Sequence, residues 1–434
     1  MKKLFFMTIY IFLLMNCNAA DSTKREFFEL ANKCNNENIQ ICIDMGWTLS
    51  YLDVPAQEQA LVKENFNKLS LILEKECEKD DGKSCGALGS LFVNGKGVNQ
   101  NYNKAFVLLE KGSSKGDLKS KNLLANLYHW GSGTNKDIDK AIKLYEESCL
   151  GGIAYSCNSL ATIYSSKNFF KPDMNKAITF YQKACELDDL QSCAELGKIY
   201  MKQYTDNRNN SFFSSKLAID YYIKACDGKD NRLIASSCAT LGEIFFDGII
   251  TNNDYNKAFF YSNKACTNLD ENGCGILGIL YKEGLGIQKN LLKALELFDT
   301  SCKSNDMKSC GNLANFYENG IVIKKDTKKA LNLYETACNN WDGESCNHLG
   351  EMYKRGEVVQ KDFFKAFQFF SKSCAAKNIS SFGCNNAGLM IENGEGQKFD
   401  LNNILSYYEK ACDLKNLDGC SNYARLKKTY NIKN

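Results

Sequence analysis

Twenty of the 21 cysteines in this chain fall into pairs whose members lie close together in the sequence. The ten pairs are Cys34 with Cys42, Cys77 with Cys85, Cys149 with Cys157, Cys185 with Cys193, Cys226 with Cys238, Cys266 with Cys274, Cys302 with Cys310, Cys338 with Cys346, Cys374 with Cys384 and Cys412 with Cys420. Eight of them are separated by eight positions, and such regular local pairing predicts disulfides, which persist in oxidising compartments. The spacing is not that of zinc ligands, and the two histidines, His129 and His348, lie in different parts of the chain. We therefore expect no metal and no cofactor.

The N-terminus points to export. Lys2 and Lys3 precede an almost wholly apolar run at 4–15, which is too short to span a bilayer and is followed by small residues. This pattern is typical of a secretory signal peptide, so we expect residues 1–19 to be removed together with the unpaired Cys17. The alternative is a lipoprotein anchored through Cys17, although the residues before it are not the small ones that normally precede a lipidated cysteine.

Composition excludes some partners and favours one kind of secondary structure. The net charge is +3 over 434 residues, so no large basic field is available for a nucleic acid. No later segment is long and apolar enough to cross a membrane. With only two prolines, and with many strong helix formers, the chain can be almost entirely helical. We predict a periplasmic or secreted protein without a transmembrane segment in the mature chain.

The cysteines lie in a repeated pattern that predicts the helices around them. Counting from the second cysteine of a pair, leucine recurs three positions later, glycine or alanine four later and an aromatic residue seven later. One copy has Cys274, Leu277, Gly278 and Tyr281 at these positions, which together form one face of an α-helix. We expect the small residue to allow a neighbouring helix backbone to approach. Glycine ten positions on, here Gly284, predicts that this first helix ends there.

A second amphipathic run follows the glycine turn. It has alanine eight positions and an aromatic residue four positions before the next cysteine, as in Ala294, Phe298 and Cys302. Each repeat is therefore predicted to be a helical hairpin, with a first and a second helix. First cysteines are often 36 residues apart, as at Cys266 and Cys302, which indicates a stack of similar units.

The spacing of eight fits a bridge across the turn between repeats. If the first cysteine ends a second helix and the other cysteine opens the next first helix, the turn brings their Cα atoms within the ~4.4–6.8 Å of a disulfide. Within one continuous helix they would be about 12 Å apart. One unit breaks the rule, because Ser113 and Lys121 stand where cysteines belong. We predict eleven units and ten bridges, with this junction either a flexible joint or one held by packing alone.

The pattern Leu277-Gly278, Tyr281, Gly284-Leu285-Gly286, then Lys293-Ala294, Phe298 and Cys302, resembles the Sel-1-like repeat. With a cysteine pair in nearly every copy, residues 26–426 look like the Helicobacter cysteine-rich protein family, which are secreted Sel-1-like solenoids. The resemblance implies a tetratricopeptide-like fold that serves as an interaction scaffold. It also implies the β-lactamase or penicillin-binding label that members of this family commonly carry.

That label predicts chemistry that can be looked for in the residues. A serine β-lactamase needs Ser-x-x-Lys, supported by Ser-Asp-Asn and Lys-Thr-Gly, and none of these motifs occurs in the chain. The catalytic residue of such an enzyme is therefore unknown. A hydrolase acting on β-lactams or peptidoglycan remains the alternative function, implied by the family resemblance alone.

Asparagines near the start of the first helices are the candidate ligand-groove residues. They follow the second cysteine by one or two positions and are Asn158, Asn312, Asn347, Asn385 and Asn422. An asparagine side chain offers one acceptor and two donors, which suits the backbone of a bound peptide. The competing interpretation is helix N-capping, for which asparagine is also preferred.

These observations predict an all-α, right-handed superhelical solenoid of about eleven helix-turn-helix repeats. After the signal peptide we expect an N-terminal capping unit and connection at 21–76, tandem repeats at 77–420, and a C-terminal cap helix and tail at 421–434. The leading function is a scaffold that binds a peptide, a protein or a cell-wall fragment, including a peptidoglycan fragment or a β-lactam.

Overall fold

The computed structural model describes most of the chain. The described residues are 29–48, 59–166, 172–206, 211–228, 231–248, 250–356 and 358–432. The predicted signal peptide at 1–19, including Cys17, lies outside them. The chain divides into two compact units, Met1–Leu196 and Gly197–Asn434, and each is described by itself.

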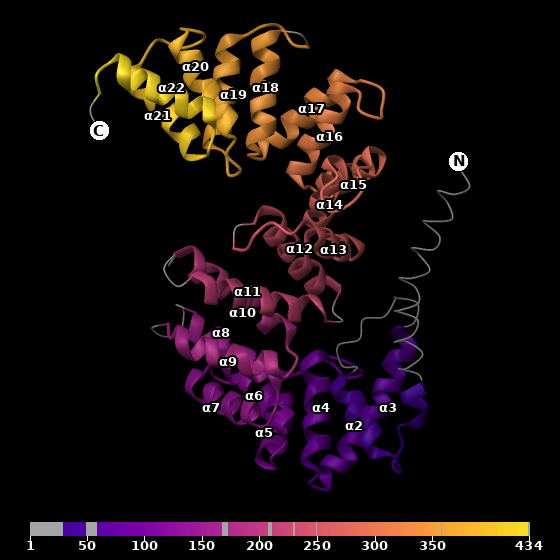
Figure 1. The fold of residues 1–434 in the computed structure, drawn as a ribbon. Coiled ribbons are helices and arrows are strands. Elements are labelled where there is room, and N and C mark those ends of the chain that lie inside the picture. Colours follow the sequence, from indigo (N-terminus) through magenta and orange to yellow (C-terminus); the bar gives the residue numbers. More distant parts are fainter. Residues whose placement is uncertain are drawn as a thin grey trace. The chain divides into compact units, whose positions relative to one another are not determined.

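Two kinds of helix alternate along the chain (Figure 1). The first helices are α2 (Ile39–Thr48), α4 (Gly82–Asn94), α6 (Leu118–Trp130), α8 (Ala154–Ser165), α10 (Leu190–Asp206), α12 (Asn231–Asp247), α14 (Glu271–Glu283), α16 (Met307–Asn319), α18 (Gly343–Arg355), α20 (Ser381–Glu392) and α22 (Leu417–Thr429). The second helices are α3 (Gln59–Glu78), α5 (Tyr102–Ser114), α7 (Ile138–Leu150), α9 (Met174–Glu186), α11 (Ser211–Cys226), α13 (Tyr255–Thr267), α15 (Leu291–Lys303), α17 (Thr327–Asn339), α19 (Phe363–Ala375) and α21 (Leu401–Asp413). The predicted all-α solenoid of helix-turn-helix repeats is confirmed.

Helices pack in sequence order within each unit. A first helix such as α4 contacts the second helices on both sides of it, α3 and α5. Successive first helices also contact each other, as α4 and α6 do in the first unit, and α16, α18 and α20 do in the second. We call the side formed by successive first helices of a unit its first-helix face. The last helix, α22, begins at Leu417. The predicted C-terminal cap helix and tail at 421–434 therefore starts within this helix.

Capping residues explain where the first helices begin. The residue before the helix accepts a hydrogen bond from the backbone N–H three positions later, which satisfies one of the free donors of the first turn. The residues that do this are Asp81, Asp117, Asp270, Asp306, Asp342, Ser380 and Asn416. Several first helices end at a glycine with positive φ, as α14 does at Gly284 with φ of 75°, where a side chain would be strained.

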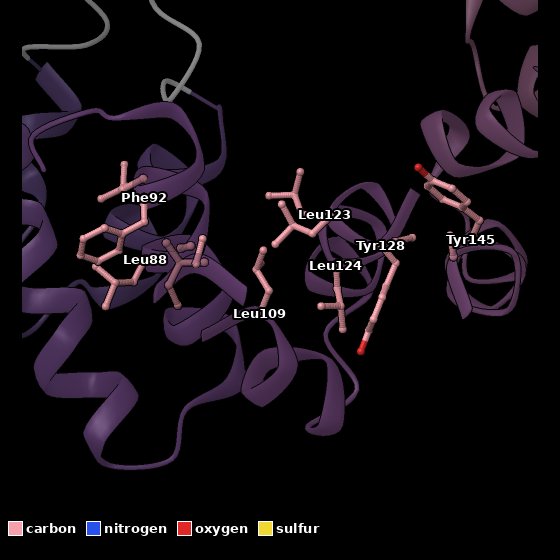
Figure 2. Packing of buried hydrophobic residues seen from close by; sticks show 14 of the residues in the cluster. Leu88, Phe92, Leu109, Leu123, Leu124, Tyr128 and Tyr145 are labelled. Atoms are coloured by element: carbon pink, nitrogen blue, oxygen red, sulfur yellow. The ribbon is translucent and has the colours of Figure 1, made fainter. Parts of the chain in front are cut away.

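The core lies between each first helix and the second helices around it. Figure 2 shows Leu88 and Phe92 of α4 near Leu109 of α5, and all three are buried. The small residue four positions after the cysteine has a reason that differs from our expectation. A Cβ on Gly278 would lie 2.7 Å from the ring of Phe298. The group that approaches is therefore the aromatic side chain of the second helix, not a helix backbone.

All ten predicted cysteine pairs are disulfide-bonded in the structure. The bridges are Cys34–Cys42, Cys77–Cys85, Cys149–Cys157, Cys185–Cys193, Cys226–Cys238, Cys266–Cys274, Cys302–Cys310, Cys338–Cys346, Cys374–Cys384 and Cys412–Cys420. Their Cα atoms lie between 4.4 Å, in the last of these bridges, and 5.0 Å, in the bridge from Cys226 to Cys238.

The bridges have the same place in the repeats as the sequence predicts. The first cysteine of a bridge, such as Cys302, stands at the end of a second helix, and the other, such as Cys310, lies in the first turn of the next first helix. The second cysteines are buried, except for the half-buried Cys420, and Cys42, Cys157 and Cys384 have no exposed surface. The bridges therefore link neighbouring repeats only and lie inside the stack.

Candidate functional site

A cavity of about 690 Å³ opens on the first-helix face of the first unit. Its lining comes from one face of α2, the last turn of α3, the starts of α4 and α6, the turn after α5, and Ile153 just before α8. The lining residues are Ile39, Gln40, Ile43, Asp44, Trp47, Glu76, Asp81, Gly82, Lys83, Lys115, Gly116, Asp117, Leu118, Lys119 and Ile153. We call it the Trp47 cavity. Cavities of ~300–1,000 Å³ are of the size that holds drug-sized ligands.

The apolar part of the Trp47 cavity depends on how α2 packs. Ile43 is buried, and the indole of Trp47 is half-buried against α4. The indole fits there because position 86 is glycine, since a Cβ on Gly86 would lie 2.8 Å from the Trp47 ring. The Lys119 Nζ lies 5.7 Å from the indole centroid, in a cation–π contact. Trp47 is therefore held in a fixed place at the cavity wall.

Two of the carboxylates that line the cavity are committed to helix caps. Asp81 accepts from the backbone N–H of Ser84, and Asp117 from that of Ser120 at 2.8 Å. Each also accepts from the hydroxyl of the same serine. These carboxylates therefore fix the starts of α4 and α6 and have little capacity left for a ligand.

Other charges at the cavity are already paired. Glu76 pairs with Lys79 at 2.7 Å, and Lys115 pairs with Asp80. Lys83, by contrast, forms no ion pair with any residue in the described part of the chain. Lys119 has its cation–π contact, and Asp44 accepts a 3.0 Å hydrogen bond from Gln40. The charged lining groups without an ion pair among the described residues are thus the Lys83 and Lys119 ammonium groups and the Asp44 carboxylate.

The five candidate asparagines lie elsewhere, one turn or more inside their helices. The residue before the helix supplies the side-chain cap of α16, α18, α20 and α22, and α8 has no side-chain cap. None of the five candidates therefore caps its helix, and the capping interpretation is wrong. In the first unit, Asn158 donates to the Asp189 carboxylate at 3.1 Å and to the Ser192 hydroxyl at 2.8 Å. Both acceptors stand at the start of the next first helix, so this amide ties two repeats together.

The asparagines of the second unit make similar ties. Asn422 Nδ2 donates to Asn385 Oδ1 at 3.0 Å, and Asn386 donates to Asn347 at the same distance. Asn312 differs, because its amide donates within its own helix, to the Lys308 carbonyl at 3.0 Å. Four of the five candidates therefore bond between successive first helices. None of the five lines the Trp47 cavity.

Carboxylates extend this polar network along the second unit. Glu318 accepts from the buried Tyr334 hydroxyl at 2.9 Å, and His348 stacks on the same tyrosine ring. Burial, together with the Glu318 charge, raises the pKa of Tyr334. Two repeats later, Glu392 accepts from Tyr408 and pairs with Arg425 at 2.8 Å. The hydrogen bond from Arg425 lowers the pKa of Glu392.

The sequence did not single out the cavity residues. Trp47 stands near the end of a short helix, and its place becomes clear only when α2, α4 and α6 are seen together. Within the described ranges, no three His, Cys, Asp or Glu side chains gather as metal ligands. Over the same residues, no helix is both long and apolar enough to cross a bilayer.

Comparison with known proteins identifies the repeat. The Sel1 repeat model matches residues 82–117, 119–153, 154–189, 214–230, 235–268, 274–306, 308–340, 343–378 and 381–416. The chain belongs to the Sel1 repeat family. Eight of the nine matched segments begin near the start of a first helix, and the ninth, 214–230, lies on the second helix α11, so the Sel1 units follow the structural repeats. No curated protein matches this Sel1 repeat protein.

One of the similar solved structures supports the fold. The protective antigen c5321 of uropathogenic Escherichia coli, described as having an SLR fold, is 18% identical with a TM-score of 0.60, over 93% of this chain and 90% of that one. A Sel1 repeat protein from Oxalobacter formigenes is 14% identical over the same shares, with a TM-score of 0.36. Yeast Tom70 is 16% identical over 96% of this chain and 97% of its own, with a TM-score of 0.38. At these identities, the first likeness shows the fold alone.

Proposed function

We propose that this Sel1 repeat protein is a non-catalytic binding scaffold that works in the periplasm or outside the cell and holds a peptide segment of a partner protein. Its repeats form an extended surface of the kind that solenoid proteins use for interaction. The ten disulfides are typical of an oxidising compartment. The observation that carries the proposal is the Trp47 cavity, which opens on the first-helix face of the first unit.

A blocking variant tests the proposal. Gln40 is exposed at the cavity, so Gln40→Trp places a bulky side chain at its mouth without disturbing the core. Lys143→Trp is the matched control, because Lys143 is exposed on α7 and does not line the cavity. Wild-type oxidised protein and both variants are used to capture partners from a cell-envelope extract, with identification by mass spectrometry.

We expect a partner that binds the wild type and the control and is lost with Gln40→Trp. Identical partners for all three proteins would contradict the proposal. Turnover of a chromogenic cephalosporin by the purified protein would instead support the hydrolase alternative. Capture of glycan fragments that contain no peptide would show that the ligand is a cell-wall fragment and not a peptide.

A further inference from the structure

We propose that Asn393 is a site of spontaneous deamidation, and that this modification loosens the last repeats of the second unit as the molecule ages. It does not depend on what the scaffold binds. Four Asn-Gly pairs occur in the sequence, at 94–95, 272–273, 319–320 and 393–394. Because glycine adopts many backbone conformations, its nitrogen can approach the preceding side chain in all four pairs when the chain is unfolded. The fold distinguishes them, since it restrains each pair to a different degree.

The reaction needs only water as a co-reactant. The backbone nitrogen of the glycine loses its proton and attacks the side-chain carbonyl carbon of the asparagine. The bond from that carbon to the side-chain nitrogen breaks, and ammonia leaves with the proton. Water then adds to one of the two carbonyl carbons of the resulting succinimide and opens the ring, which gives aspartate or isoaspartate without any oxidation or reduction. For the attack, the glycine N–H must leave its hydrogen bond and the asparagine side chain must turn towards it.

Two of the four pairs are held at the ends of helices. Asn94 is the last residue of α4 and Asn319 is the last residue of α16. Each side-chain amide donates to the carbonyl four positions earlier, at 2.9 Å and 3.0 Å. The glycine of the second pair is also covered, since a Cβ on Gly320 would lie 3.3 Å from the Cβ of Lys325. Neither asparagine can turn towards its glycine without losing a hydrogen bond of its side chain.

The pair at 272–273 lies in the first turn of α14, where the attacking nitrogen is held. The Gly273 N–H donates to the Asp270 carboxylate at 2.8 Å, as part of the helix cap. Gly273 is also buried, and a Cβ there would lie 2.4 Å from the Cβ of Ala265 on α13. The nitrogen of this glycine is therefore both hydrogen-bonded and enclosed, which opposes the attack.

Asn393 is the least restrained of the four asparagines. It follows the last residue of α20 and stands at the C-cap of this helix. Its side-chain amide forms no hydrogen bond within the described part of the chain, and both Asn393 and Gly394 are exposed. Around Gly394, no described atom beyond its chain neighbours lies within 4 Å of the place that a Cβ would take. The attack therefore requires mainly that the Gly394 N–H leave the Ile391 carbonyl, to which it donates at 3.1 Å.

The product would weaken the end of α20. A carboxylate at the C-terminus of a helix is disfavoured by the helix dipole, and here it would stand between Glu392 and Glu395. Glu392 accepts from Tyr408 of α21 and pairs with Arg425 of α22, so this end of α20 is tied to both following helices. Isoaspartate also lengthens the backbone by one carbon, which disturbs the 2.8 Å hydrogen bond from the Glu395 N–H to the Met390 carbonyl. Deamidation should therefore loosen the packing of α20 against α21 and α22.

Peptide mapping of the aged protein tests the site. Oxidised protein is kept folded at mildly alkaline pH for several weeks, and aspartate and isoaspartate are measured at each Asn-Gly pair by mass spectrometry. We expect Asn393 to convert at least several-fold faster than Asn94, Asn272 and Asn319. In reduced and denatured protein the four should convert at similar rates, because the fold no longer restrains them. Equal rates in the folded protein, or no conversion at Asn393, would overturn the proposal.

Two variants connect the modification to the loosening. Asn393→Gln keeps an amide but needs a larger ring, which closes much more slowly, so it should show no conversion at this position. Asn319→Gln is the matched control and should leave conversion of Asn393 unchanged. Hydrogen exchange at 385–408 should rise with age in the wild type and in Asn319→Gln, and should stay constant in Asn393→Gln. Conversion without a rise in exchange, or an equal rise in Asn393→Gln, would show that deamidation does not loosen these repeats.

Discussion

The junction between α5 and α6 has no disulfide and the junction between α17 and α18 has one, yet their backbones make the same hydrogen bonds. The Asp117 N–H donates to the Gly112 carbonyl at 3.1 Å, and the Asp342 N–H donates to the Ala337 carbonyl at 3.1 Å. The caps agree as well, since each aspartate accepts from the backbone N–H three positions later, at 2.8 Å and 2.9 Å. The shape of the turn therefore does not depend on the bridge.

The difference teaches what the disulfides contribute. A bridge that does not shape the folded turn acts mainly by restricting the unfolded chain. At the unbridged junction Lys121, which replaces a cysteine, pairs with Glu147 of α7, so this contact does not cross the turn between α5 and α6. Its left-handed position is Gly116, with φ of 83°, whereas the bridged junction has Trp341 there with φ of 66°. A bulky residue in this conformation costs ~1–2 kcal/mol, which the bridged junction tolerates.

Reduction of all bridges should have the largest effect. Each bridge that closes about nine residues is worth ~2–3 kcal/mol in the chain-entropy model, so reduced protein should melt at a much lower temperature. Amide exchange should rise at bridged turns such as 337–346. At 112–121 it should change less, because no local bridge is lost there. Melting curves and hydrogen exchange with and without reductant measure this, and an unchanged melting temperature would show that the bridges do not stabilise the fold.

Adding the missing bridge should give the next largest effect. The double variant Ser113→Cys with Lys121→Cys places cysteines at the spacing used elsewhere, and should raise the free energy of unfolding by ~2–3 kcal/mol. Exchange at 112–121 should fall. Lys121→Ala serves as the control for the lost ion pair to Glu147. If exchange at this turn already equals that at 337–346 in the wild type, packing alone holds the junction and it is not a flexible joint.

Removing the helix caps should separate the contribution of the hydrogen bonds at the turn from that of the disulfide. Asp117→Ala and Asp342→Ala each remove a cap worth ~1 kcal/mol, which denaturant unfolding measures. Local exchange should increase more at the Asp117 junction, because the Cys338–Cys346 bridge still holds the other turn closed. Equal increases at both turns would mean that the bridge does not limit local opening.

The asparagine hydrogen bonds between successive first helices should contribute no more to the free energy of unfolding than the helix caps do. Asn385→Ala leaves the Asn422 amide without its acceptor and should cost ~0.5–1.5 kcal/mol. Asn312→Ala is the matched control, because its amide bonds within its own helix, and it should cost little. Partner affinity is measured on the same proteins. Reduced affinity for the partner with unchanged stability would show that these asparagines bind the backbone of a peptide, as the sequence predicts.

The ion pair between Glu392 and Arg425 should give the smallest effect. Arg425 lowers the folded pKa of Glu392 from 4.5, so the stabilisation is present above the unfolded pKa and is lost as pH falls through the folded pKa. Arg425→Gln should reduce this acid dependence by no more than about 1 kcal/mol. Disulfide ties have no such dependence. Identical acid unfolding of wild type and variant would show that this charge pair adds nothing.

Much of the fold could be predicted because its signals are local. The spacing of Cys302 and Cys310, the leucine and aromatic positions and the terminal glycines each report on one turn or one helix face. The role of Asn158 could not be read in this way, because its partners Asp189 and Ser192 lie 31 and 34 positions away. The same holds for the Trp47 cavity, whose walls come from four helices.

Because each bridge joins residues that are only eight to twelve positions apart, it sets how the chain would respond to mechanical tension. A pull on the two ends can unravel both helices of a repeat while the turn between repeats stays closed as a small covalent loop. The chain would then lengthen in steps shorter than a whole repeat. At the unbridged junction, 112–121, the turn would open as well and add its full length to the step. When the molecule is stretched, the junction without a disulfide would therefore give one extension step that is longer than the others.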